Sequence, residues 1–310
     1  MEIVIKKLVF GIFLCFSAHK ILLFNISIFN FNTAVSVLSY SKIILISAFC
    51  KRRYIMDKVS ICIVTHNNEK EILNLIKSIY LFTEGIDLRL YVVDNNSKDE
   101  TIKLITKNFP NITIIKSRKN LGFGKAHNLV LNKITSDFHI IINPDIVLKS
   151  NAIMDLLDYL KRHKDVVIVT PKIVFEDGKI QFLPKKDPKV KYMLAGKFER
   201  YSTYFESLRR EYTMQKKSYS DDPFCIDFCT GCFMLIRTKI FKKLKGFDER
   251  FFMYLEDADL SRRARKYGKI MFIPKVEVIH TWHRESSKNI KFFLIHLVSM
   301  FKYFIKWKNH

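Results

Sequence analysis

Apolar and polar residues follow two alternating patterns from residue 59 onward. Short apolar runs predict buried strands, and apolar residues spaced three and four apart predict helices. The predicted strands are 59–65, 88–94, 112–116, 138–143 and 166–170, and the predicted helices are 69–82, 98–108, 124–133 and 152–162. Strands that alternate with helices indicate βαβ units. The sequence therefore predicts an α/β fold with a mostly parallel sheet flanked by helices.

Between residues 185 and 222 this periodicity lapses into a basic, tyrosine-rich stretch. We expect an insertion or a mobile loop there. The last segment, residues 288–310, again has helical spacing and predicts a basic amphipathic helix. Its expected apolar face comprises Ile290, Phe293, Leu294, Leu297, Phe301 and Phe304, and Lys291, Lys302 and Lys306 lie away from that face. On a membrane, Phe304 and Trp307 would lie at the boundary between the lipid headgroups and the hydrocarbon. Such a helix lies on an anionic membrane surface, or alternatively packs on the preceding α/β domain.

Residues 1–55 differ from the remainder of the chain. Lys6 and Lys7 precede a short apolar run, and a second apolar run over residues 21–49 is interrupted by polar residues. Because Met56 stands directly before the first predicted strand, one interpretation is a spurious or dispensable extension translated from an earlier start. A membrane anchor is the other main interpretation, and a cleaved export signal is the least favoured.

Composition narrows the class of partner. The chain has 310 residues, 48% of them hydrophobic, and a net charge of +23. This content is ample for a buried core, and the charge indicates an anionic partner. No nucleic-acid-binding motif is present, so phosphorylated substrates and an anionic membrane surface are favoured over nucleic acid. Six cysteines without framework spacing indicate a reducing compartment.

One apolar strand ends abruptly at Asn143-Pro144-Asp145. Pro144 has no N–H with which the strand could continue, so Asp145 leaves the sheet at its carboxyl edge, where open α/β sheets bind ligands. A carboxylate there suits Mg²⁺ or Mn²⁺ that is held mostly by substrate phosphates. The alternative is that Asp145 only caps a following helix.

Polar residues follow two other strands. Thr65-His66-Asn67 ends the first, and Asp94-Asn95-Asn96-Ser97 ends the second. These groups can hydrogen-bond a nucleoside, with Asp94 accepting from a base N–H or a ribose hydroxyl, while Asn67 and Ser97 are also candidate helix caps. Further on, Gly122 and Gly124 precede a helix, where backbone can approach a phosphate and Lys125 can add charge.

Cys225, Cys229 and Cys232 have a spacing that can hold an iron–sulfur cluster. Because they lie among apolar residues, three buried core cysteines are the favoured interpretation. Glu256 and Asp257 open a predicted helix, near its positive dipole end, where a carboxylate is kept ionised. An ionised acid can act as the general base for a hydroxyl nucleophile. Two acids at a helix start are also common without function.

Eight short motifs in order give the chain a resemblance to family 2 glycosyltransferases of the GT-A fold, most closely to the bacterial rhamnosyltransferase-like branch. They are residues 59–67, 93–97, 120–128, 143–145, 230–232, 246–248 and 256–257, and His280. The resemblance covers about residues 58–287. It implies a GT-A domain over residues 56–287, between the extension 1–55 and the helix 288–310.

The resemblance also implies roles for individual residues. Thr65 and Asp94 would contact the nucleotide base or ribose, and Asn96 and Asn120 would line the same pocket. With Asn67, Gly122, Lys125 and Asn143 they form the expected nucleotide-sugar site.

For the reaction itself, the resemblance makes Asp145 the metal ligand on the diphosphate and Asp257 the catalytic base. His280 would reach the metal or the diphosphate, although His283 offers a second imidazole nearby. Many relatives carry an aspartate where this chain has Asn143. Only one carboxylate then serves the ion, so metal affinity without nucleotide should be weak.

The implied activity is an inverting, metal-dependent transfer from a dTDP- or UDP-sugar, first of all dTDP-rhamnose, to a lipid-linked or surface polysaccharide. The implied location is the cytoplasmic face of the inner membrane of a bacterium, peripheral or N-terminally anchored. Another hexosyl- or galactofuranosyltransferase of the same fold is the first alternative. An iron–sulfur enzyme and a non-catalytic nucleotide-sugar-binding module are the others.

Overall fold

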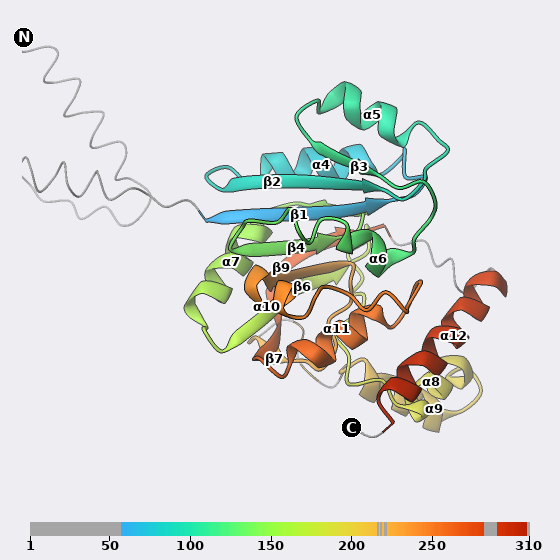
Figure 1. Cartoon of the computed structure of the whole chain (residues 1–310). Coiled ribbons are helices and arrows are strands. Elements are labelled where there is room, and N and C mark those ends of the chain that lie inside the picture. Colours follow the sequence, from blue (N-terminus) through green and yellow to red (C-terminus); the bar gives the residue numbers. More distant parts are fainter. Residues whose placement is uncertain (1–56, 216, 218, 220–221, 282–289, 309–310) are drawn as a thin grey trace, which may run out of the picture. The chain divides into compact units, whose positions relative to one another are not determined.

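Nine strands form one sheet in the computed structural model, which describes residues 57–281 and 290–308 apart from 216, 218, 220 and 221 (Figure 1). The strands are β1 (Lys58–Thr65), β2 (Asp87–Asp94), β3 (Thr113–Lys116), β4 (Phe138–Ile142), β5 (Ile146–Leu148), β6 (Val166–Val174), β7 (Phe224–Cys225), β8 (Phe233–Arg237) and β9 (Lys269–His280). The helices are α4 (Ile72–Leu81), α5 (Thr101–Asn108), α6 (Phe123–Asn128), α7 (Ala152–Arg162), α8 (Val190–Phe198), α9 (Thr203–Tyr212), α10 (Thr238–Lys243), α11 (Glu256–Ala264) and α12 (Ile290–Lys306). Residues 1–55 and His283 lie outside the described residues.

The strand order is β3-β2-β1-β4-β8-β6-β9-β5, and β7 pairs with β9. β1 runs parallel to β2 and β4, β2 runs parallel to β3, and β6 runs parallel to β9. β8 is antiparallel to β4 and β6, and β5 and β7 are antiparallel to β9. β5 follows β4 after residues 143–145 alone, too short a connection for a crossover helix. The predicted α/β fold is confirmed, with the parallel pairing concentrated in the first four strands.

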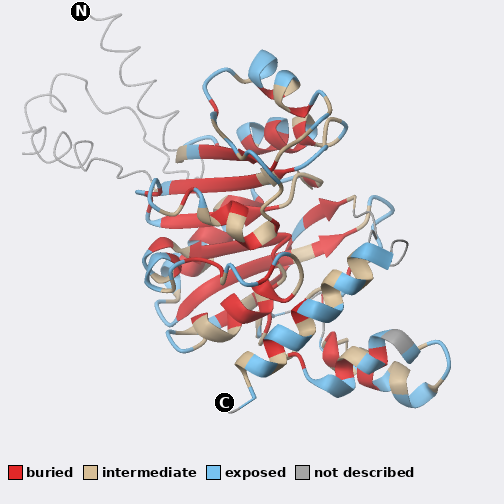
Figure 2. Cartoon of the chain, turned by 45° about the vertical axis from the view of Figure 1, so that its right-hand side comes forward, coloured by how far each residue is buried: buried red, intermediate tan, exposed pale blue. Residues whose placement is uncertain are grey.

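Alternation along β1 divides the core into two layers. Val59, Ile61 and Ile63 pack with α4 and α7, whereas Cys62 packs with α10 and α11 on the opposite face. Successive strand residues point to opposite faces, so an uninterrupted apolar run fills both layers. Figure 2 shows the buried strands between these helices. Because β1, β2 and β4 are parallel and packed on both faces, their carboxyl ends lie together at one edge of the sheet.

The segment that lost its periodicity contains two helices, α8 and α9. The expected mobile loop is therefore wrong for residues 190–212. Tyr192 and Ala195 of α8 are buried, while Val190, Leu194 and Phe198 are exposed. Because apolar residues occupy both faces of α8, the sequence shows no amphipathic period there.

The predicted C-terminal helix is confirmed as α12, but two of its residues lie differently. Trp307 Nε1 donates to Asp259 Oδ1 at 3.0 Å, and Lys306 Nζ pairs with Asp248 Oδ2 at 2.7 Å. Both side chains are therefore bound to the domain and not available to headgroups. Tyr303 is fully buried in the same interface. Among the described residues, no helix is long and apolar enough to cross a membrane.

Candidate functional site

The carboxyl ends of β1 and β2 bring the first predicted residues together. Thr65 and Asp94 are register partners at the last position of the two strands, and both are buried. Asp94 Oδ1 accepts a hydrogen bond from the Ser97 N–H at 2.8 Å, which fixes the carboxylate at the strand end. This edge is where a doubly wound sheet binds its ligands.

Asn67 and Asn96 both lie in left-handed backbone, at φ 59° and 71°. Asn67 Oδ1 accepts from the Lys98 N–H at 2.7 Å, and the Asn67 N–H donates to Ser97 Oγ at 3.1 Å. Since α4 begins at Ile72 and α5 at Thr101, and neither helix has a side-chain cap, the interpretation of Asn67 and Ser97 as helix caps is wrong. These residues join the two loops to each other instead.

Asn95, which the sequence did not single out, organises this edge. Its Nδ2 donates to Asn120 Oδ1 at 3.0 Å and to the Gly122 carbonyl at 3.1 Å, and its Oδ1 accepts from the Leu121 N–H at 2.8 Å. The side chain therefore ties the glycine-containing turn to the end of β2. Nothing in the run Asp94-Asn95-Asn96 distinguishes the residue that faces inward.

The glycines of that turn are explained by the chain itself. A Cβ at Gly122 would lie 1.9 Å from the Phe252 carbonyl oxygen, and one at Gly124 would lie 2.7 Å from Phe247 Cβ. Packing against Phe252 and Phe247 therefore explains why both positions are glycine, and the approach of a phosphate to the backbone of this turn stays a prediction. Lys125 Nζ pairs with Glu249 at 2.8 Å, so its charge is matched within the protein.

We predict that Gly122→Ala destabilises the protein more than Gly178→Ala does. Both glycines have φ near +80°, but nothing lies within 4 Å of a Cβ at Gly178. Gly178→Ala should cost about 1–2 kcal/mol from backbone strain. Gly122→Ala should add the cost of overpacking, about 1–3 kcal/mol more. Urea unfolding of the two variants measures the difference, and equal midpoints would contradict the close packing of Gly122 on Phe252.

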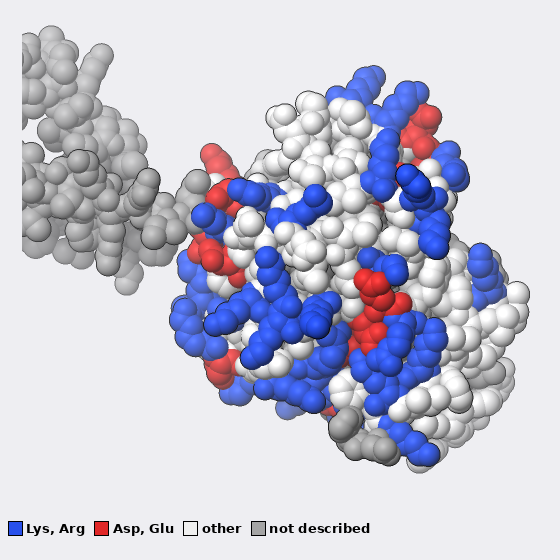
Figure 3. All heavy atoms as spheres, in the orientation of Figure 1, with Lys and Arg blue, Asp and Glu red and all other residues white. Residues whose placement is uncertain are grey.

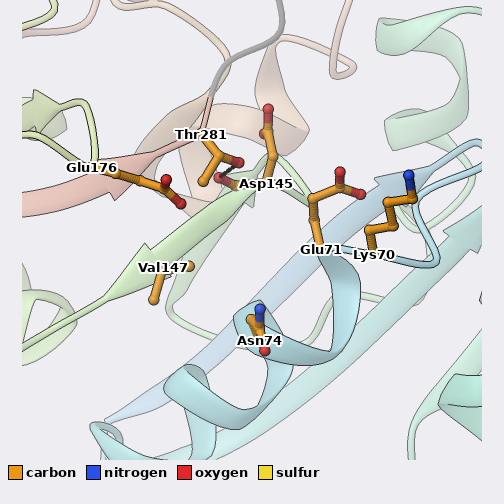
Figure 4. A pocket seen from close by; sticks show the side chains of 7 residues that line it. All are labelled: Lys70, Glu71, Asn74, Asp145, Val147, Glu176 and Thr281. Carbon is orange, nitrogen blue, oxygen red and sulfur yellow. Dashed lines mark hydrogen bonds between the residues drawn. The ribbon is translucent and has the colours of Figure 1, made fainter.

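The turn at Asp145 leads into a strand and not a helix, so the capping interpretation is wrong. Ile146 pairs with His280 across β5 and β9, which places Asp145 Oδ1 3.2 Å from His280 Nε2. Asp145 Oδ1 is buried and makes no hydrogen bond. The carbonyl of Asp145 accepts from the Thr281 N–H at 3.0 Å and from Thr281 Oγ1 at 3.2 Å, the contact drawn in Figure 4.

Gln181 sets the orientation of the His280 ring. Gln181 Nε2 donates to the His280 carbonyl at 2.8 Å, so Gln181 Oε1, 2.9 Å from Nδ1, accepts the Nδ1 proton. In the neutral ring Nε2 then presents its lone pair toward the Asp145 carboxylate. Two facing acceptors, with the histidine oriented by a second hydrogen bond, fit a divalent cation.

The chain offers only part of a coordination shell. No three His, Cys, Asp or Glu side chains converge on a metal position within the described residues. The other ligands would be phosphate oxygens and water, the usual arrangement for Mg²⁺ at a nucleotide. A pocket of about 280 Å³ adjoins Asp145, and Glu71, Val147, Glu176 and Thr281 also line it (Figure 4).

The acid pair opens α11 after two residues of left-handed backbone, Tyr254 at φ 71° and Leu255 at φ 67°. Such conformations cost about 1–3 kcal/mol each and persist only where the surroundings enforce them. The Phe252 carbonyl accepts from the Phe123 N–H at 2.9 Å on one side. On the other side, Ser299 Oγ of α12 donates to the Met253 carbonyl at 2.7 Å. The glycine turn and α12 thus hold the loop that presents the acids.

Burial and neighbouring charges change the pKa values of Glu256 and Asp257 to different extents. Burial, and next the charge of Asp257, raise the pKa of Glu256 well above its ordinary value. Burial also raises the pKa of Asp257, but the Lys185 charge and the Gly231 N–H, which donates at 3.0 Å, oppose that rise. The protonated form is therefore favoured more strongly at Glu256 than at Asp257, which fits Asp257 as the carboxylate of the pair. For Glu256 the direction runs against the expectation that the helix start keeps an acid ionised, because burial raises its pKa.

Residues 230–232 connect the acid pair to residues 143–145, the turn that contains Asp145. The Gly231 N–H donates to Asp257 Oδ2, and the neighbouring Cys232 carbonyl accepts from the Asn143 N–H at 2.9 Å. Asn143, Asp145 and Asp257 are thereby placed around one short segment. This arrangement can hold a diphosphate and its cation beside a general base.

Cys229 and Cys232 are buried, whereas Cys225 is exposed in β7. The expectation of three core cysteines is therefore wrong for Cys225. Because these three residues do not form a metal-binding group, the iron–sulfur interpretation is excluded for them.

The chain is similar in sequence to one family of known proteins. The model of the family described as "Glycosyl transferase family 2" matches residues 60–245. The N-acetylglucosaminyl-diphospho-decaprenol L-rhamnosyltransferase of Mycobacterium tuberculosis is 27% identical over 240 residues, covering 72% of this chain and 76% of that protein. The rhamnosyltransferase WbbL of Escherichia coli is 27% identical over 258 residues, covering 79% of this chain and 92% of that protein.

Two solved structures share the fold. The Staphylococcus aureus TarS fragment 1–349 superposes with a TM-score of 0.51 at 18% identity, covering 72% of this chain and 60% of that one. The mannosyltransferase PcManGT of Pyrobaculum calidifontis, solved with GDP-Man and Mn²⁺, superposes with a TM-score of 0.54 at 16% identity, covering 88% of this chain and 74% of that one. The chain thus spans about three fifths of the TarS fragment.

Proposed function

Because the chain belongs to glycosyl transferase family 2, we propose that it transfers a sugar, first of all rhamnose, from a nucleoside-diphosphate sugar to an acceptor hydroxyl. The single observation that carries this proposal is the joining of Asp145 and Asp257 through residues 230–232. This joining supports a cation-binding role for Asp145 and a general-base role for Asp257, because both residues lie beside the same short segment. The names of the two curated relatives support rhamnose as the sugar.

In this mechanism each residue has a distinct task. Thr65, Asp94, Asn96 and Asn120 receive the nucleoside at the ends of β1 and β2. Asp145 and His280 would hold Mg²⁺ or Mn²⁺, which supplies positive charge against the leaving diphosphate. Asp257 accepts the proton of the acceptor hydroxyl as its oxygen attacks the anomeric carbon from the face opposite the diphosphate. Attack from that face inverts the anomeric configuration.

The proposed acceptor is a lipid-linked or surface polysaccharide, and the proposed place is the cytoplasmic face of a bacterial inner membrane. The support is α12, whose residues Ile290, Leu294, Leu297, Val298, Phe301 and Ile305 are exposed in one stripe. Phe293 and Phe304 of the expected face are half-buried instead. The exposed stripe differs from the expected apolar face because Tyr303 and Ser299 pack into the domain and so fix the rotation of α12 about its axis.

We predict that activity is lost on acidification at a pH above the ordinary aspartate range. Asp257 must be deprotonated to accept a proton, and burial raises its pKa. The ionisable groups near the Asp257 carboxylate are Glu256, Lys185, Cys229, Cys232 and Tyr212. Since the Lys185 charge lowers the Asp257 pKa, Lys185→Gln should move the acid limb of kcat/KM to higher pH.

The matched control is Lys189→Gln, which removes an exposed lysine from the same segment. The pH profiles of donor hydrolysis by the three proteins test the prediction. An unmoved limb in Lys185→Gln, or an equal displacement in Lys189→Gln, would show that Lys185 does not act on the base.

A further inference from the structure

Two helices beside α12 expose a second row of apolar side chains. Val190, Leu194 and Phe198 of α8 are 58%, 46% and 38% exposed, and Tyr201 and Tyr204 at the turn into α9 are 83% and 63% exposed. The spacing of four residues puts Val190, Leu194 and Phe198 on one side of α8, and Tyr201 and Tyr204 follow where the chain turns into α9. Contiguous apolar surface of this kind marks an interaction site in a soluble protein.

The two exposed rows belong to one rigid unit. Tyr192 and Ala195 of α8, Leu208 and Tyr212 of α9, and Tyr303 of α12 share a single hydrophobic cluster. Figures 1 and 2 both place α12 beside α8 and α9. In Figure 3 the lower right of the molecule, where Figure 1 shows these helices, is mostly uncharged. We call the exposed residues of α8, its turn into α9 and α12 the docking surface.

Charge identifies the kind of partner. Residues 290–308 include no acidic residue. The three acids of α8–α9 are all paired, Glu199 with Arg209 at 3.5 Å, Glu206 with Arg210 at 2.7 Å and Glu211 with Lys186 at 2.9 Å, so none adds unmatched negative charge. The exposed cations Lys189, Arg200, Lys291 and Lys308 stand at the ends of α8 and α12. Apolar faces with cations at their ends fit the interface of an anionic bilayer.

We propose that α8–α9 and α12 together form one membrane-docking surface, so that the inserted hairpin is a second membrane contact beside α12. This inference rests on the proposed function only for the lipid-linked acceptor. Ser299 Oγ and Lys302 Nζ of α12 donate to the carbonyls of Met253 and Arg250, each at 2.7 Å. The loop that presents Asp257 is thereby fastened to the docking surface. The base is held at a fixed position relative to the bilayer that carries the acceptor.

Tryptophan quenching in the full chain tests each helix separately. Phe198→Trp and Phe301→Trp place a reporter in α8 and α12, and Leu81→Trp is the control because Leu81 of α4 is 70% exposed outside the docking surface. The probe is a vesicle of phosphatidylglycerol and brominated phosphatidylcholine. We expect quenching of both docking reporters beyond the native tryptophan signal, and none of the control. Quenching at position 301 alone would leave α12 as an anchor and overturn the joint surface.

Flotation of the full chain with vesicles of the same lipids without bromine measures how much the apolar row of α8 and that of α12 each contribute to membrane binding. Leu194→Gln/Phe198→Gln and Leu294→Gln/Phe301→Gln should each lower binding at least about tenfold, and Leu81→Gln should not. Undiminished binding of the α8 variant, or a dimer by light scattering with no quenching, would overturn the proposal. Donor hydrolysis in detergent-free solution should be unchanged in the α8 variant, so loss of docking is distinguishable from failure of the proposed enzyme activity.

Discussion

Asp257→Asn should lower the rate of sugar transfer about 10²–10⁴-fold, the range typical of general acid–base catalysis, while nucleotide binding is retained. The carboxylate accepts from the Gly231 N–H at 3.0 Å and from the Ala258 N–H at 2.9 Å, and the single amide oxygen can keep one of these bonds in a side chain of the same size. What is lost is the group that takes the proton of the acceptor hydroxyl. Single-turnover transfer with saturating donor measures the chemical step directly.

The matched control is Glu256→Gln, one residue away. Because burial and the neighbouring charge favour the protonated form of Glu256, a neutral glutamine resembles that form of the side chain. We expect nearly wild-type transfer. An inactive Glu256→Gln beside an active Asp257→Asn would require the two acids to exchange roles.

The second large effect is expected at Asp145, in the turn between β4 and β5. Asp145→Asn should reduce transfer at least about 10²-fold, since it removes the carboxylate that would hold the cation against the leaving diphosphate. Glu176→Gln changes another acid of the same pocket and should have little effect. A thermal melt of both variants checks that β5 still pairs with β9.

Two further measurements separate metal loss from misfolding. Excess chelator should inactivate the wild-type protein, and Mn²⁺ should restore it. Mn²⁺ binding in the presence of nucleoside diphosphate, followed by electron paramagnetic resonance, should fall in Asp145→Asn. Full activity of the wild type in excess chelator would contradict the role assigned to Asp145 and His280.

The sequence predicted those parts of the molecule that local pattern determines. β1, β2 and β4 are short apolar runs buried on both faces, and their ends carry the polar residues that were singled out. The strand-terminating effect of Pro144 needs no distant partner, so the exit of Asp145 from the sheet was predictable. The acid pair was also visible, because its helix has a regular apolar spacing from Leu260 to Ala264.

What the sequence missed depends on contacts between distant segments. The reason for Gly122 is the Phe252 carbonyl, and the partner of Trp307 is Asp259. Neither contact leaves a local period. Burial of the Glu256 side chain raises its pKa, which an isolated helix dipole does not indicate. Likewise the sequence of α8 shows no amphipathic period, because both faces of this helix are apolar.

The most direct test of the central claim is transfer by the full chain from dTDP-rhamnose to a lipid-diphosphate-linked N-acetylglucosamine, with Mg²⁺ or Mn²⁺ present. We expect dTDP release in equal amount to a rhamnosylated product whose anomeric configuration is opposite to that of the donor. Other nucleotide sugars, UDP-sugars first, should be tested in parallel. A folded protein that binds nucleotide but neither transfers nor hydrolyses any donor of the panel would contradict the claim.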